Sequence, residues 1–187
     1  MKNTKSLFVQ CSTICLLIIF LASCSVNKAK IDNSLKKYFD AKNVDGCFTM
    51  LNNADGEITV YNMALDTMRL TPASTFKIVN SLIGLQTGAV TNEKMIIPWD
   101  GIKRPNNDWN KNMDIREAFK VSCVPFYQEV ARRIGKDTMQ QWIDSLSYGN
   151  RNISGPIDSF WLNNNLKISP DEQLGLLKML YFDQLPF

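Results

Sequence analysis

The chain contains no histidine among its 187 residues. This absence excludes a Ser-His-Asp catalytic triad, and with only five cysteines it argues against a zinc site, because histidine and cysteine are the usual zinc ligands. Net charge is also small. The net charge is +3, of which Lys2 and Lys5 supply two, so we expect no nucleic-acid partner. What the chain does contain is a core-forming composition, 45% hydrophobic and 10% aromatic, which fits one globular domain.

The first 24 residues have the pattern of an export signal. A basic start is followed by the apolar run ICLLIIFL (residues 14–21), which is too short to span a bilayer comfortably, and then by LASC (residues 21–24). LASC resembles the lipobox of bacterial lipoproteins. The resemblance implies cleavage before Cys24, lipidation of Cys24, and an exported domain anchored to a bacterial membrane and facing the periplasm. An ordinary cleaved signal in which Cys24 falls by chance is the alternative.

We expect three segments along the chain: the signal in residues 1–24, a tether with a first helix in residues 25–45, and the main domain in residues 46–187. The first helix is predicted over residues 31–39. The stretches GCFTMLN (46–52) and EITVYNM (57–63) alternate around Asp55 and Gly56, which predicts a β-hairpin.

Helical signals dominate the rest of the chain. We predict helices over residues 74–86, 125–134, 137–146 and 169–181. Gly88 and Gly135 follow the first two as stop signals, Asp137 is expected to cap the third, and Ser169 with Glu172 forms a capping box for the fourth. Strands come first and helices follow, which indicates an α+β fold.

Two cysteines remain in the predicted domain. Cys47 and Cys123 could pair in an oxidising compartment, but two isolated cysteines do not make a disulfide framework. We expect two small buried side chains.

A serine and a lysine three residues apart occur three times: Ser25 with Lys28, Ser34 with Lys37, and Ser74 with Lys77. The first two pairs lie in polar, lysine-rich sequence. Only Ser74 begins an apolar helix, FKIVNSLIGL, which directs the lysine stem toward the core. The spacing alone also fits a capping serine followed by a lysine that extends to solvent.

Burial would change the chemistry of Lys77. A desolvated lysine has a lowered pKa, and its neutral amine can act as a base. At i, i+3 spacing the two side chains project from one helix face, and the helix N-terminus favours negative charge near Ser74. This pattern indicates a serine nucleophile served by a lysine.

Several further segments, in a fixed order along the chain, support a catalytic role for the Ser74-Lys77 pair. PASTFKIVNSLIGLQTG resembles the active-site helix of the class D serine β-lactamases, the oxacillinases. WDGIKRPNNDWN, AFKVSCVPFYQEVARRIG, SYGN and IDSFWLNNNLKISPDEQ resemble that family's later segments, from about Gly46 to Phe187. The resemblance implies a penicillin-binding or β-lactamase fold and β-lactam substrates, with no cofactor beyond carbon dioxide.

The resemblance also implies roles by position. Ser74 would be acylated, Lys77 would become a carbamate (N6-carboxylation) that acts as general base, and Ser122 would relay a proton. Val124 would limit water and Trp161 would hold the carbamate, although a core aromatic alone also explains Trp161.

Three further expectations concern the surroundings of this site. We expect Tyr148, Gly149 and Asn150 to act as scaffolding, a role that a simple turn also explains. Without the resemblance, Ser122 would be read as a serine in the capping region before the helix that begins at Pro125. Phe76 and Trp99 are expected to serve in packing.

The family's third motif, K-T-G, is absent from these 187 residues. We therefore expect an N-terminal part of a class D enzyme, with the C-terminal strands and final helix missing, that folds poorly and hydrolyses little. A penicillin-binding sensor or transpeptidase relative, and an inactive remnant, remain as alternatives.

Overall fold

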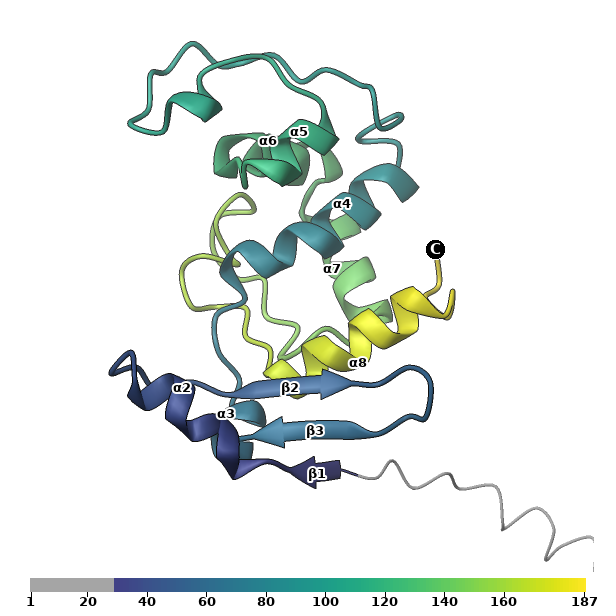
Figure 1. Ribbon diagram of the computed structural model, residues 1–187. Helices are drawn as coiled ribbons and strands as arrows, with labels where there is room; N and C mark the ends of the chain where they lie inside the picture. Colours follow the sequence, from purple (N-terminus) through teal and green to yellow (C-terminus); the bar gives the residue numbers. More distant parts are fainter. Residues whose placement is uncertain (1–28) are drawn as a thin grey trace, which may run out of the picture.

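A computed structural model describes residues 29–187. A three-stranded sheet carries helices α2 and α3 beside it, helix α8 lies across it, and helices α4 to α7 form a second body above α8 (Figure 1). Within residues 29–187 no helix combines the length and the apolar character needed to cross a membrane. The predicted signal segment and Cys24 lie outside the described residues.

The predicted hairpin is confirmed. Strands β2 (Phe48–Leu51) and β3 (Ile58–Tyr61) pair antiparallel. Gly56 in the connecting turn has φ +74°, a conformation that glycine adopts without a steric penalty. The sheet order is β1-β3-β2.

The third strand, β1 (Ala29–Ile31), corrects our expectation for this part of the tether. It pairs parallel with β3, and the Asp32 amide continues the contact by donating to the Val60 carbonyl at 2.8 Å. The sequence did not predict this strand, because three exposed residues are too few to show the alternation of apolar and polar side chains that separates a strand from a tether. The domain boundary at residue 46 stays a prediction.

The first helix begins later than predicted. A 3-10 turn covers Asn33–Leu35 and α2 covers Lys36–Asp40. The Asp32 carboxylate accepts from the Ser34 amide at 2.9 Å, which fixes the start of the turn at this position. The Phe39 ring stacks on Tyr61 with centroids 4.9 Å apart, so the segment packs on the sheet.

The four later helices are confirmed with small shifts: α4 (Phe76–Gln86), α6 (Val124–Ile134), α7 (Lys136–Ser145) and α8 (Pro170–Tyr181). Two short helices, α3 (Met63–Asp66) and α5 (Ile115–Lys120), carried too few turns for a periodic signal. Asp137 is not the cap of α7, because the helix begins at Lys136 and Asp137 already lies in its first turn.

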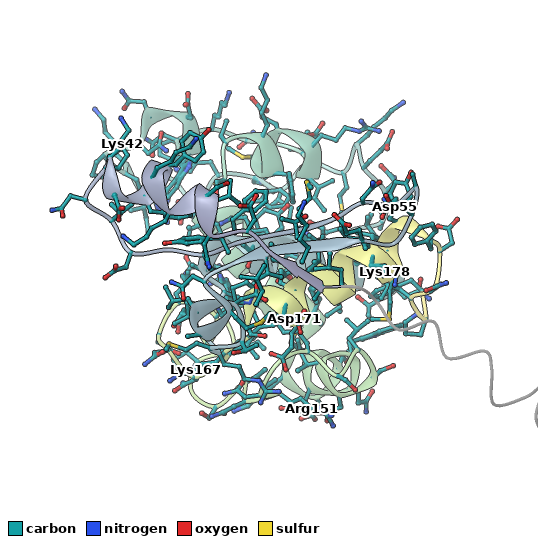
Figure 2. All side chains as sticks on the ribbon, turned by 60° about the horizontal axis from the view of Figure 1, so that its bottom comes forward. Lys42, Asp55, Arg151, Lys167, Asp171 and Lys178 are labelled. Atoms are coloured by element: carbon teal, nitrogen blue, oxygen red, sulfur yellow. The ribbon has the colours of Figure 1, made fainter. Side chains whose placement is uncertain are left out.

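The core forms where α4, α6 and α7 meet the segments around residues 148 and 160. Phe76 is fully buried there, as expected. Trp99 is not a core residue: it is 36% exposed, and its indole N–H donates to the Ile102 carbonyl at 3.1 Å. Charged side chains such as Lys42, Asp55 and Arg151 project from the periphery of the molecule (Figure 2).

Both cysteines of the domain are free. Cys123 is buried as expected, whereas Cys47 is only half-buried, because it immediately precedes the outer strand β2.

The capping box of α8 yields a stability prediction. The Ser169 Oγ accepts from the Glu172 amide at 3.1 Å, and the Glu172 carboxylate accepts from the Ser169 amide at 2.9 Å. Ser169→Ala removes the first of these bonds and should lower the free energy of unfolding by about 1 kcal/mol in urea titrations. Ser145→Ala, at the exposed end of α7, is the control and should leave the free energy of unfolding within about 0.5 kcal/mol. Equal effects of the two changes would contradict the assignment.

Candidate active site

Ser74 lies in a 3-10 turn, Ala73–Thr75, that leads directly into α4. The preceding residue, Ala73, has φ +46°, and its amide donates to the Trp161 carbonyl at 3.1 Å. The turn is therefore held by tertiary contact rather than by local preference. Ser74 itself is exposed, which leaves its hydroxyl accessible to a substrate.

Lys77 is placed as the spacing predicted. It is only 2% exposed, and its Nζ lies 3.0 Å from the Ser74 Oγ, to which it donates. The same Nζ lies 5.7 Å from the centre of the Tyr127 ring. Burial lowers the pKa of Lys77 below its ordinary value, since the low-dielectric surroundings penalise the ammonium.

Ser122 completes a polar cluster with these two residues. It immediately precedes Cys123, the N-terminal cap residue of α6, and has φ +51°. The left-handed backbone turns its side chain toward α4, and its Oγ donates to the Ser74 Oγ at 3.2 Å. One hydroxyl is thus contacted by both Lys77 and Ser122. Val124, half-buried, is the first residue of α6 just beyond.

The structure separates this cluster from the other serine-lysine repeats. Ser34 and Lys37 lie in an exposed turn and helix, where the Lys37 Nζ extends over the Tyr38 ring at 5.1 Å. The repeat that begins at Ser25 lies outside the described residues. Of the two described copies, only the buried one forms a serine-lysine hydrogen bond.

Trp161 belongs to the wall behind the cluster. Its side chain is 1% exposed and stacks on Phe76, with ring centroids 5.4 Å apart, while Phe160 meets both rings edge-on. The packing role expected for Trp161 is therefore present. Through its carbonyl, Trp161 also fixes the turn that carries Ser74.

Tyr148, Gly149 and Asn150 belong to the scaffold of the Ser74 hydroxyl cluster, where the Tyr148 ring packs edge-on against Phe76 with centroids 5.7 Å apart. The Tyr148 hydroxyl donates to the Gln173 side chain at 3.0 Å, and burial raises the pKa of Tyr148. The Asn150 side chain accepts from the Lys167 amide at 3.0 Å and donates to the Asn165 carbonyl at 2.8 Å. These contacts hold the loop that follows Trp161.

Two site residues were missed from the sequence. Asn80 is fully buried on α4, and its Nδ2 donates to the Tyr127 carbonyl at 3.1 Å, which ties α4 to α6. Tyr127 forms a wall of the Lys77 pocket, its hydroxyl lies 2.9 Å from the Ser81 Oγ, and burial raises its pKa to about 12. A signal existed for Asn80: it follows Lys77 by three residues, on the same helix face.

Comparisons with known proteins agree with this geometry. A family model described as the penicillin binding protein transpeptidase domain matches residues 37–183. The chain belongs to that family. Its relatives there include β-lactamase OXA-5 of Pseudomonas aeruginosa, 40% identical over 172 residues, which cover 91% of this chain and 64% of the relative.

Two further relatives place the chain within the family. The solved class D β-lactamase FUS-1 (OXA-85) of Fusobacterium nucleatum subsp. polymorphum is 40% identical with a TM-score of 0.81, and the match covers 84% of this chain and 66% of that one. Regulatory protein BlaR1 of Bacillus licheniformis is 35% identical over 80% of this chain but only 25% of its own length. The OXA-5 and FUS-1 matches support the class D serine β-lactamase assignment and its α+β fold. The chain spans about 64% of the length of OXA-5.

The family's Tyr-Gly-Asn segment yields a steric prediction. Gly149 has φ +52°, and a Cβ there would lie 1.9 Å from the Lys167 carbonyl oxygen. Gly149→Ala should lower the free energy of unfolding by at least about 2 kcal/mol, because backbone rather than a flexible side chain must move. Gly175→Ala is the matched control. An added Cβ meets nothing within 4 Å there, and the change should stabilise α8 by about 0.5–1 kcal/mol. Similar urea midpoints for the two variants would contradict this account.

Burial of Lys77 also predicts a pH dependence. Its folded pKa lies below the unfolded value, so in the interval between the two the unfolded chain binds more protons and stability rises with pH. Urea titrations from neutral pH toward pH 10.5, the ordinary pKa of a lysine, should show the wild type gaining free energy of unfolding relative to Lys77→Met. A difference that stays constant across this interval would mean that the amine is not desolvated.

Proposed function

We propose that this chain carries the acylation half of a β-lactam hydrolase, with Ser74 as nucleophile and Lys77 as the base-bearing residue. The observation that carries the proposal is the 3.0 Å contact between an exposed serine hydroxyl and a 2% exposed lysine amine. A lysine with a lowered pKa is neutral more often near pH 7 than a solvated one, and a neutral amine can accept the serine proton. The Ser74 oxygen then attacks the β-lactam carbonyl and opens the ring.

Lys77 would act most effectively as a carbamate. Its neutral amine adds to carbon dioxide, forms an N–C bond and releases a proton, which leaves a carboxylate at the site of the amine. The buried pocket formed with Tyr127 supports this reaction, because burial lowers the pKa of Lys77 and so favours the neutral amine that reacts. The Trp161 indole N–H would donate to the carbamate, and Val124 would limit the access of water.

Ser122 would complete the proton path. Its hydroxyl contacts the Ser74 Oγ at 3.2 Å, so it can relay a proton from the base toward the nitrogen that leaves the opened ring. The backbone amides at the start of α4 favour the negative charge that develops on the attacked carbonyl oxygen. No metal or organic cofactor enters this scheme; carbon dioxide is the only added reactant.

Turnover distinguishes this function from a penicillin-binding sensor or transpeptidase, which would acylate and stop. The 40% identity to OXA-5, against 35% to BlaR1, favours turnover over the sensor. The 187 residues lack K-T-G. We therefore expect slow turnover by this chain, and a chain with no turnover at all would be the inactive remnant. We further propose export and a lipid anchor at Cys24, which would place the domain against a bacterial membrane.

Intact-mass spectrometry after mixing with benzylpenicillin tests the proposal. We expect a covalent penicilloyl adduct that Ser74→Ala abolishes and Ser34→Ala leaves unchanged, because Ser34 stands in the same S-x-x-K spacing without the burial. In bicarbonate buffer the adduct should disappear with time. Lys77→Arg should lengthen the adduct lifetime at least about tenfold, because a guanidinium cannot form the carbamate.

The possible results separate the alternatives. A persistent adduct would indicate the sensor or transpeptidase, and no adduct from a chain that is folded by circular dichroism would indicate the remnant.

A further inference from the structure

A cavity of about 350 Å³ lies beside α6 and is lined in part by Cys123, the residue that precedes the helix. It is formed by the segments 97–100 and 109–113 and by the side of α6 that carries Pro125, Glu129 and Arg133. These three residues follow helical spacing on one face. Tyr127 and Val130, on the other face, are buried where α6 meets α4. Ser74, Lys77 and Ser122 do not line the cavity, whereas Cys123, which directly follows Ser122, does.

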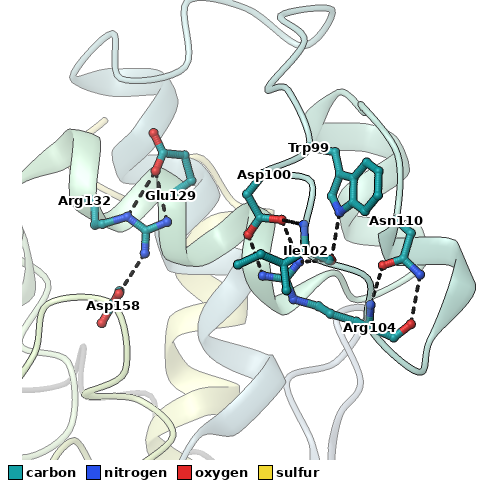
Figure 3. A network of polar contacts seen from close by, with 8 residues as sticks. All are labelled: Trp99, Asp100, Ile102, Arg104, Asn110, Glu129, Arg132 and Asp158. Carbon is teal, nitrogen blue, oxygen red and sulfur yellow. Dashed lines mark hydrogen bonds and ion pairs between the residues drawn. The ribbon is translucent and has the colours of Figure 1, made fainter.

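The inner part of the cavity is apolar and fixed. Ile97 and Met113 are buried and pair with each other in an isolated antiparallel bridge, and Phe126 is 4% exposed beside them. Trp109 is held because its indole N–H donates to the Val121 carbonyl at 3.1 Å. Trp99 stands at the exposed side with its indole held by Ile102 (Figure 3). Aromatic faces on a rigid frame suit the body of a flat ligand.

In the cavity the carboxylates have hydrogen-bond partners on both oxygens, whereas some of the cationic groups keep free N–H donors. Both oxygens of Glu129 already accept, one from Arg132 at 3.0 Å and one from Arg133 at 2.9 Å, and Arg132 also reaches Asp158 at 2.7 Å (Figure 3). Both oxygens of Asp100 are taken by Arg104. These ion pairs lower the pKa values of both carboxyls, that of Asp100 to about 2, so both stay ionised and accept only.

The hydrogen-bonding capacity that remains free in the cavity belongs to donors. Among residues 29–187, Arg133 uses only its Nε, so both terminal nitrogens of its guanidinium are without an acceptor. Lys111 bonds one carboxylate oxygen, of Glu117, at 2.5 Å and has two further N–H donors. A ligand that matches this cavity therefore presents acceptors to the rim and an aromatic ring to the interior.

We infer that this cavity is a binding site for small aromatic carboxylates, separate from the active site. The ring lies among Trp109, Phe126 and Met113, and the carboxylate bonds Arg133 and Lys111. An arginine can take a carboxylate with two parallel hydrogen bonds, which are stronger than bonds to a neutral amide. The volume is at the lower end for small-molecule sites and fits a single substituted ring.

Fluorine NMR titration of the full chain with 4-(trifluoromethyl)benzoate tests the inference. We expect saturable binding that is about tenfold tighter than that of 4-(trifluoromethyl)benzamide, which keeps the ring but loses the charge. The compound 4,4,4-trifluorobutanoate, which keeps the charge but loses the ring, should also bind at least about tenfold more weakly. Absence of saturable binding of the benzoate, or equal binding of benzoate and benzamide, would overturn the inference.

Variants locate the site. Arg133→Gln should weaken benzoate binding about tenfold and leave the benzamide unchanged, and Lys111→Gln should act in the same direction. Glu129→Gln should tighten benzoate binding severalfold, because it frees Arg132 and Arg133 from a competing carboxylate. General destabilisation of the protein would not weaken benzoate binding in one variant and tighten it in the variant of a neighbouring residue.

Two controls complete the experiment. Arg151→Gln, at the periphery away from the cavity, should change nothing (Figure 2). Ser74→Ala should also leave benzoate binding unchanged, which separates this site from the proposed hydrolytic one. Benzoate binding that is unaffected by both Arg133→Gln and Lys111→Gln would place the ligand elsewhere and overturn the assignment.

Discussion

The arrangement of this domain depends on the burial of one amine. Lys77 is carried into the core by a helix whose other buried side chains are apolar except for Asn80, and its only hydrogen-bond partner among the described residues is the Ser74 hydroxyl. Burying an amine costs free energy in proportion to its charge, so the fold favours the neutral form. The cost of the burial and the reactivity of the lysine therefore have the same physical origin.

The surrounding structure keeps this cost from being relieved by movement. Asn80 ties α4 to α6 through the Tyr127 carbonyl, and the Trp161 carbonyl holds the turn that carries Ser74. The left-handed conformations of Ala73 and Ser122 are unfavourable for such residues in isolation. That of Ala73 is held by the bond from its amide to the Trp161 carbonyl, and the Ser122 amide bonds the Phe119 carbonyl. Backbone strain next to Ser74 and at Ser122 indicates that the surrounding scaffold imposes the geometry of the site.

The sequence predicted the parts of this arrangement that depend on local pattern. The hairpin, four helices and the Ser74-Lys77 pair follow from alternation, helix end signals and the contrast between an apolar helix and its polar copies. The Ser122 contact could be expected only from the family resemblance, since nothing local predicts that residue 122 turns back toward a helix 48 positions earlier. Strand β1 and the Tyr127 wall were missed for a related reason: both are defined by what they pack against rather than by their own residues.

The same reasoning explains why α6 can serve two sites. A helix has faces about 100° wide, and here one face is occupied by α4 and the Lys77 pocket while the charged face meets the segment around Trp99 and Trp109. Cys123 and Val124, which begin the helix, lie between the two regions, next to Ser122. A ligand that contacts Cys123 therefore touches the residue adjacent to the proton relay.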